Sequence, residues 1–205
     1  MKLIVITTET LINREAVAFN LLFEAGLGVL HLRKPFASQS EVENLVKQVD
    51  RAYHSQIVLH DHYELVKSFD LKGIHLNRRN PVLPAFLSGK KPLSVSRSCH
   101  SLDELVASGS CDYVFLSPIF DSISKAGYKQ EFTPEKLSRA KDDGIINDRV
   151  VALGGITKEQ IPVVRQYGFG GVAVLGTLWC GFVNNGNTEE LLKRFDELNF
   201  ECKRI

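Results

Sequence analysis

The sequence predicts an eightfold β/α barrel, because short apolar segments alternate with helix-forming or polar segments along the whole chain. Two further observations support this fold class. No linker or low-complexity segment interrupts the alternation. The last two units, residues 150–176, are β-branched segments that end abruptly at glycines and are joined by one helix, which is typical of a right-handed βαβ unit.

Length and composition fit one barrel domain over residues 1–205. The chain is near the short end of the range for this fold, and its 44% hydrophobic and 24% charged residues are typical of a globular protein with a sizeable core. A doubly wound open sheet is the alternative architecture. It ranks second because no glycine-rich dinucleotide motif follows the first strand.

The first half of the chain supplies four expected strands, each a short aliphatic run such as Leu3–Thr7. The helix expected over Glu15–Ala25 has apolar side chains at helical spacing and ends at Gly26. Side chains alternate along a strand, so the segment VLHLR places His31 and Arg33 on one face. The remaining expected elements are strand 29–33, helix 41–53, strand 57–61, short helix 63–69 and strand 73–76.

The second half supplies the other four strands. Residues 77–91 are expected to form mainly loop, and a longer polar loop is expected over 118–133. Ser101 is the expected N-cap of a short helix, and Pro134 takes the first position of a helix that follows Thr133. The remaining expected elements are strand 93–98, helix 102–108, strands 113–117, 150–153 and 171–176, and a last helix over 188–199.

Charge and cysteine content limit the classes of partner. The formal net charge of +1 indicates neither a nucleic acid nor a membrane surface. No apolar run has the length of a membrane span or a signal peptide. The four cysteines, Cys99, Cys111, Cys180 and Cys202, are scattered without a CxxC pair, which favours a reducing compartment and argues against structural zinc. We therefore expect a cytoplasmic protein; the oligomeric state is left open, with a homodimer as one alternative.

Glycines directly follow the seventh and eighth expected strands, at Gly154-Gly155 and at Gly176. Such turns leave backbone N–H groups accessible to a closely approaching anion. In β/α barrels a phosphate commonly binds at the loops after the last two strands. For one turn alone a simple tight turn is the better interpretation, but for the consecutive turns we predict phosphate binding.

Functional residues of a β/α barrel lie at the C-terminal ends of its strands. The polar residues expected there are His31, Arg33, His60, Asp61, His75, Ser98, His100, Ser117, Ser122, Ser124 and Lys125. Arginine and lysine opposite a glycine-rich phosphate cradle suit a phosphorylated or diphosphorylated substrate. The Asp61 carboxylate is a candidate Mg²⁺ ligand, with substrate phosphates and water completing the coordination. A single histidine is more often a packed residue than a catalyst.

The order of these motifs resembles the thiamine phosphate synthase and thiazole tautomerase superfamily over nearly the whole chain. The matching segments are VLHLRKP, IVLHDHYELVKSFDLKGIHL, SVSRSCHSLDEL, CDYVFLSPIFDSISK, VVALGGIT and GVAVLG. The resemblance implies a compact barrel of one of two activities. The synthase joins hydroxymethylpyrimidine diphosphate to a thiazole phosphate and releases pyrophosphate with magnesium, whereas the tautomerase aromatises the thiazole carboxylate phosphate.

The resemblance also implies roles for single residues. These are diphosphate binding by Arg33, magnesium binding by Asp61, contact with pyrophosphate by Ser98, substrate binding in the loop of Ser122, Ser124 and Lys125, and a thiazole phosphate cradle at Gly155, Leu175 and Gly176. In all cases the partners are small phosphorylated heterocycles, with no nucleic acid and no membrane.

Several positions depart from the synthase pattern. His31 stands where the synthase has glutamine, His60 replaces an asparagine that holds the pyrimidine, and Pro35 replaces a second cationic residue. Asn80 replaces a second magnesium aspartate. Lys34 points to the other face of an ideal strand, unless a bend before Pro35 redirects it. These changes all lie in the half of the expected site that would bind the pyrimidine diphosphate. Their position favours a reaction on thiazole phosphate alone.

Three hypotheses follow. The first is a thiamine phosphate synthase; Asp61, Ser98 and Pro118, together with the Lys125 loop, match it and we favour it. The second is a tautomerase in which His31 or His60 moves a proton near the working pH. The tautomerase has its catalytic histidine after the sixth strand, where this chain has Ser117-Pro118. The third is a non-catalytic protein that binds thiazole or thiamine phosphate.

Overall fold

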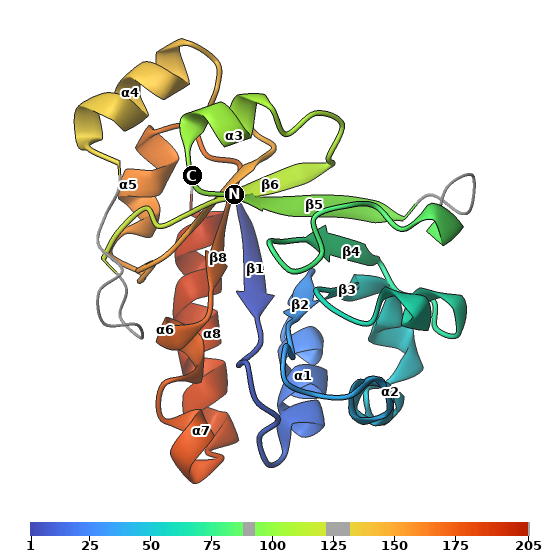
Figure 1. Cartoon of the computed structure of the whole chain (residues 1–205). Helices are drawn as coiled ribbons and strands as arrows, with labels where there is room; N and C mark the ends of the chain where they lie inside the picture. The colour runs from blue at the N-terminus through green and yellow to red at the C-terminus, as the bar shows by residue number, and fades with distance from the viewer. Residues whose placement is uncertain (88–92, 122–131, 205) are drawn as a thin grey trace.

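Eight parallel strands form a closed barrel in which each strand pairs with its neighbours in sequence and β8 closes on β1 (Figure 1). The structure is a computed structural model and describes residues 1–87, 93–121 and 132–204. The strands are β1 (Lys2–Ile6), β2 (Leu30–Leu32), β3 (Ile57–Leu59), β4 (Gly73–Leu76), β5 (Ser94–Cys99), β6 (Tyr113–Leu116), β7 (Val150–Leu153) and β8 (Gly171–Val174). The predicted eightfold barrel is confirmed, and the alternative of an open sheet is wrong.

Helices surround the barrel, although the helical layer is less regular than the sequence predicts. The α-helices described are α1 (Glu15–Glu24), α2 (Gln39–Gln48), α3 (Leu102–Val106), α4 (Pro134–Asp142), α5 (Ile161–Gln166), α6 (Gly176–Trp179), α7 (Phe182–Asn185) and α8 (Thr188–Lys203). Three 3₁₀ helices accompany them: η1 (Arg51–Gln56), η2 (Tyr63–Lys67) and η3 (Ala85–Leu87). The connection from β3 to β4, residues 60–72, is near the minimum length of a crossover, so it holds η2 instead of an α-helix.

Local sequence signals set several helix boundaries. The predicted N-caps are confirmed, because Ser101 Oγ accepts from Glu104 N and Thr133 Oγ1 accepts from Lys136 N. The expected helix over 41–53 is split, since α2 ends at Gln48 and η1 begins after Asp50. Short helices α6 and α7 were not predicted; they precede α8, which begins at the predicted Thr188 and continues to Lys203.

The two ends of the chain meet beside the barrel, as Figure 1 shows for its N and C labels. The N-terminal amine of Met1 donates to Cys202 O at 2.8 Å. Trp179 Nε1, fully buried on α6, donates to Ile6 O at 2.8 Å and holds this helix against the end of β1. None of the described helices combines the length and apolarity that crossing a membrane requires.

The barrel interior is apolar on one side and polar on the other. Ile4, Ile6, Phe115, Val151 and Ala173 form its apolar cluster. Interiors of such barrels are usually filled with branched apolar side chains. Here the interior also contains His31, His75 and Ser96, each with 0% of its surface exposed. This polar layer lies directly beneath the ends of β2 to β5.

Candidate active site

Two histidines of the interior layer and one histidine just past β3 form a connected group. His31 Nδ1 lies 2.9 Å from His60 Nε2, and His31 Nε2 lies 2.6 Å from the Tyr113 hydroxyl. The rings of His60 and His75 are stacked, with centroids 4.2 Å apart. His31 and His60 were predicted at the accessible end of the barrel, but both are buried and lie inside this network.

His75 links the buried layer to Ser98, the residue predicted to contact pyrophosphate. His75 Nδ1 lies 2.9 Å from Ser96 Oγ, and His75 Nε2 lies 2.8 Å from Ser98 Oγ. Ser96 Oγ donates to Ile74 O, so its hydroxyl is left to accept from His75 Nδ1. His75 Nε2 is then an acceptor, and the Ser98 hydroxyl donates to it.

All three histidines are held neutral. Burial is the largest cause of the lowered pKa of His75, which falls to about 3, with smaller effects from Arg33 and Arg97. Burial likewise lowers the pKa of His31 and that of His60 well below the ordinary value. The tautomerase hypothesis required a histidine that titrates near the working pH, and neither of its two candidates has that property.

His31, His60 and His75 are also the one group of three potential metal ligands found among the described residues, with ligand atoms within 4.8 Å of one another. However, both ring nitrogens of His31 and both of His75 already have hydrogen-bond partners. The arrangement is that of a hydrogen-bonded network.

Two arginines lie near this network at the end of the barrel, Arg33 after β2 and Arg79 after β4. Arg33 follows β2 and forms an ion pair with Glu9 at 2.8 Å, with 21% of its side chain exposed. The pKa of His60 is lowered by burial first, and also by the charges of Arg33 and Arg79. Both arginines therefore lie close enough to His60 to affect its pKa, and each is paired with a carboxylate, Arg33 with Glu9 and Arg79 with Asp61.

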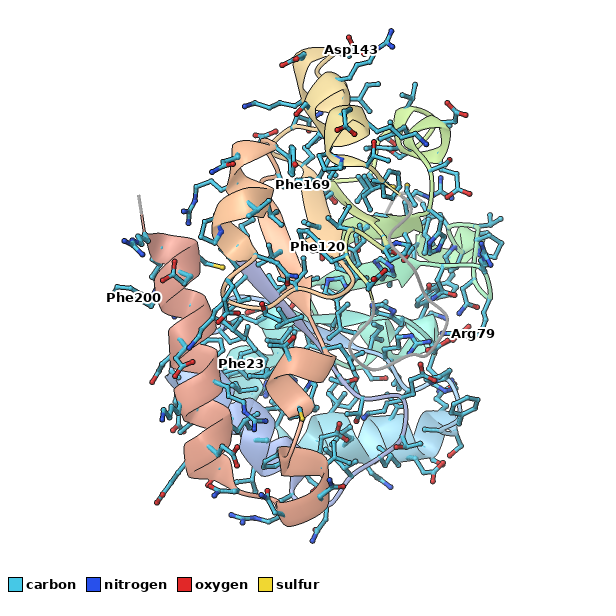
Figure 2. All side chains as sticks on the ribbon, turned by 90° about the vertical axis from the view of Figure 1, so that its left-hand side faces the viewer. Phe23, Arg79, Phe120, Asp143, Phe169 and Phe200 are labelled. Atoms are coloured by element: carbon cyan, nitrogen blue, oxygen red, sulfur yellow. The ribbon has the colours of Figure 1, made fainter. Side chains whose placement is uncertain are left out.

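The predicted magnesium ligand, Asp61, is occupied by protein groups. Arg79, on the loop after β4 and labelled in Figure 2, contacts both carboxylate oxygens of Asp61 at 3.0 and 3.2 Å through Nη2. Arg79 Nε adds a bond of 3.2 Å, and Asn80 Nδ2 donates to the same oxygen, Oδ1, at 3.2 Å. Asn80 therefore presents a donor to Asp61. A Mg²⁺ ion needs carboxylate oxygens that are free to coordinate it. The oxygens of Asp61 instead accept hydrogen bonds from a guanidinium and an amide, so this arrangement does not fit a Mg²⁺ site.

Lys34 does not replace the cationic residue that is missing at Pro35. Its side chain is 0% exposed and forms an ion pair with Glu15, at the start of α1. Its ammonium also donates to Thr8 O at 2.9 Å and to Thr10 O at 2.7 Å. Since these acceptors use its three donors, Lys34 ties β2 to the loop after β1 and does not face a substrate.

The two glycine turns lie side by side, as predicted. Thr177 Oγ1, on α6, donates to Ile156 O at 2.5 Å and joins the turn after β8 to the turn after β7. Among the described residues, no carbonyl accepts from the backbone N–H of Gly155 or Gly176. Gly155 also has φ of 64°, and a Cβ there would lie 2.2 Å from Asp121 O. The glycine is thus required by close packing, and its phosphate-binding role stays a prediction.

Ser122, Ser124 and Lys125 lie outside the described residues, so their predicted roles stay predictions. Sequence reasoning missed two site residues, Arg79 and Glu9. Arg79 stands in an Arg-Arg pair, a pattern typical of exposed loop charge, and Glu9 lies 24 positions from its partner Arg33, so no short segment shows either contact. The only available signal for Arg79 was its position next to Asn80, which replaces an aspartate of the synthase pattern.

Comparisons with known proteins agree with this geometry. A family model described as thiamine monophosphate synthase matches residues 3–178. The chain is 30% identical over 179 residues to a thiamine-phosphate synthase of Geobacillus kaustophilus, covering 81% of this chain and 80% of that protein.

Solved structures give the same result. A thiamine phosphate pyrophosphorylase from Bacteroides thetaiotaomicron superposes with a TM-score of 0.86 at 39% identity, covering 98% of this chain and 97% of that one. A pyrophosphorylase from Pyrococcus furiosus has the same fold, with a TM-score of 0.70 at 23% identity and 96% of each chain covered. The chain belongs to the thiamine monophosphate synthase family.

Proposed function

We propose that this enzyme of thiamine biosynthesis couples hydroxymethylpyrimidine diphosphate to a thiazole phosphate and releases pyrophosphate. The observation that supports the proposal is the position of two regions that we propose bind anions. Arg33 and Arg79 gather after β2 and β4, whereas the glycine turns follow β7 and β8. In a closed barrel of eight strands in order, β4 lies across from β8, and β3, which lies between β2 and β4, lies across from β7. Two phosphorylated substrates held there meet at the centre.

The reaction needs charge stabilisation and positioning. The bond between the pyrimidine methylene carbon and the diphosphate oxygen breaks, and its electron pair leaves with pyrophosphate. The lone pair of the thiazole nitrogen then forms the new carbon–nitrogen bond, so no oxidant, reductant or net proton transfer is required. Arg33 stabilises the departing anion. Ser98, whose hydroxyl donates to His75 in the free protein, turns this proton to a pyrophosphate oxygen when the anion forms. Lys125 is proposed to add a further positive charge.

Three expectations from the sequence stay proposals. These are the phosphate cradle at Gly155, Leu175 and Gly176, a cytoplasmic location, and a homodimer. A reducing compartment is supported by the four cysteines, which are all unpaired thiols. Magnesium, expected at Asp61 from the resemblance, is an open prediction, and the contacts of Asp61 with Arg79 and Asn80 speak against it.

The experiment is an assay of pyrophosphate release and thiamine phosphate formation with both substrates present. Wild type is expected to form both products in equal amounts. Arg33→Ala should lower kcat/KM by about 100-fold, because one positive charge at the leaving group is lost. Arg139→Ala is the matched control, since this α4 arginine has 86% of its side chain exposed. Absence of product from wild type, with or without Mg²⁺, would overturn the proposal.

A further inference from the structure

The loop after β4 brings a cation to the position where the resemblance places a metal. Arg79 forms three bonds of 3.0 to 3.2 Å with Asp61, in the side-on geometry that a guanidinium and a carboxylate favour. The Asp61 side chain is 14% exposed and the Arg79 side chain 43% exposed. The ion pair is therefore anchored at its carboxylate end and open at its guanidinium end.

The charges of this loop are consistent with a site that works without a metal. The family pattern has two carboxylates around a divalent cation. This chain has one carboxylate, Asp61, next to one guanidinium, Arg79, and the neutral amide of Asn80. Two carboxylates with a divalent cation have a net charge of zero, and so do one carboxylate and one guanidinium. The neutral amide of Asn80 and the arginine beside it therefore leave the site neutral without a metal ion.

Arg79 retains donors for a substrate. Its contacts with Asp61 use Nε and one side of Nη2. Within the described ranges, Nη1 makes no hydrogen bond. A guanidinium has five N–H donors in a rigid plane, so Arg79 can hold Asp61 along one edge and phosphate oxygens along another. The pKa of His60 is lowered by burial first and also by the charges of Arg33 and Arg79, so Arg33 lies near the same histidine.

We propose that Arg79, held by Asp61 and Asn80, takes the place of the metal ion and binds the diphosphate leaving group directly, which makes the reaction independent of divalent cations. This inference rests on the proposed function. The guanidinium donates to pyrophosphate oxygens as the carbon–oxygen bond breaks and negative charge accumulates on them. Asp61 is a positioning residue that fixes the plane of Arg79, and Asn80 supports Asp61.

The first test removes divalent cations. Wild type treated with chelator, and assayed with chelator present, is expected to form thiamine phosphate within about threefold of its rate with Mg²⁺. Product that forms only with Mg²⁺ would overturn the inference while the proposed synthase activity stands. Absence of product under both conditions would overturn the proposed synthase activity and, with it, this inference.

The second test uses Arg79→Ala and its neighbour. In chelator, Arg79→Ala is expected to lower kcat/KM by about 100-fold, and Arg79→Lys to retain part of the activity. The matched control is Arg78→Ala, an exposed arginine at the adjacent position, which should stay within about twofold of wild type. Equal activity of Arg79→Ala and Arg78→Ala would contradict the inference.

Binding gives a readout that does not depend on turnover. Calorimetry with inorganic pyrophosphate in chelator is expected to show binding to wild type and at least about tenfold weaker binding to Arg79→Ala. The double variant Arg79→Ala/Asn80→Asp restores two carboxylates and removes the arginine. It is expected to bind Mg²⁺ alone and to be at least about tenfold more active with Mg²⁺ than in chelator. A double variant without any response to Mg²⁺, or equal pyrophosphate binding by both proteins, would oppose the inference.

Discussion

At the scale of single residues, Lys34 and Glu15 form a buried ion pair between the segment after β2 and the start of α1. Burial raises the pKa of Glu15 and lowers that of Lys34, and each charge opposes the shift of the other. Glu15 Oε2 is buried with no hydrogen-bond partner among the described residues. Lys34 is therefore the countercharge of this carboxylate, which also accepts from Thr8 Oγ1 at 3.3 Å.

Lys34→Ala is expected to lower the free energy of unfolding by about 3 kcal/mol, because it leaves Glu15 buried without a countercharge. Urea denaturation of wild type and variant measures this difference. Lys47→Ala removes an exposed lysine paired with Glu43 and serves as the control, with little change expected. Lys34→Met/Glu15→Leu should recover most of the lost stability. If Lys34→Ala were as stable as wild type, the assignment of Lys34 as a structural residue would be wrong.

At the scale of elements, the turn after β7 is packed against the segment after β6. A Cβ on Gly154 would lie 2.9 Å from Pro118 Cα, and one on Gly155 would lie 2.2 Å from Asp121 O. Ile119 N and Phe120 N donate to Leu153 O and Gly154 O. Phe120, labelled in Figure 2, belongs to this second segment. Neither segment can move without the other, so the backbone N–H groups of the turn after β7 have a fixed position.

Gly155→Ala is expected to destabilise the protein by about 2 kcal/mol, because of its φ of 64° and the overlap with the Asp121 carbonyl. The displaced turn should also raise KM for the thiazole phosphate by at least about tenfold. Thermal unfolding and steady-state kinetics measure the two effects. Gly28→Ala is the control, since nothing lies within 4 Å of a Cβ there. An unchanged KM in a destabilised Gly155→Ala would count against the phosphate-binding role.

At the scale of the whole molecule, the barrel is closed around neutral histidines. His31 and His75 have no exposed surface, and rings of Phe115 and Tyr113 pack against them. The unfolded chain binds a proton at each histidine below its ordinary pKa of about 6.5, whereas the folded chain does not. Because the unfolded state binds more protons than the folded state, the free energy of unfolding decreases as the pH falls below about 6.5.

His75 alone is expected to reduce the free energy of unfolding by about 2 kcal/mol between pH 7 and pH 5, since its pKa in the folded protein is about 3. Denaturant unfolding at both pH values measures the loss, and His75→Asn should remove that part of the pH dependence. Phe115→Leu, a non-titrating change at a ring 4.8 Å from His75, should lower stability equally at both pH values. An identical pH dependence of wild type and His75→Asn would show that His75 is not held neutral.

The sequence by itself determined the barrel and the order of its parts. Strand and helix periodicity and the N-caps at Ser101 and Thr133 depend on neighbours within a few positions, so they can be interpreted without coordinates. The adjacency of the Gly155 and Gly176 turns follows from the order of parallel strands alone. For the same reason, the end of the barrel that carries the polar residues was predictable.

Only the tertiary structure decided where charged and polar side chains point and what they contact. The Lys34–Glu15 ion pair, the His31–His60–His75 network and the Arg79–Asp61 contact join positions 15 to 44 residues apart. A strand's alternation gives the face of a side chain, but its partner depends on which loops cross that face. Burial then sets the protonation state of each histidine, and burial is a property of the packed barrel, which no short segment of sequence contains.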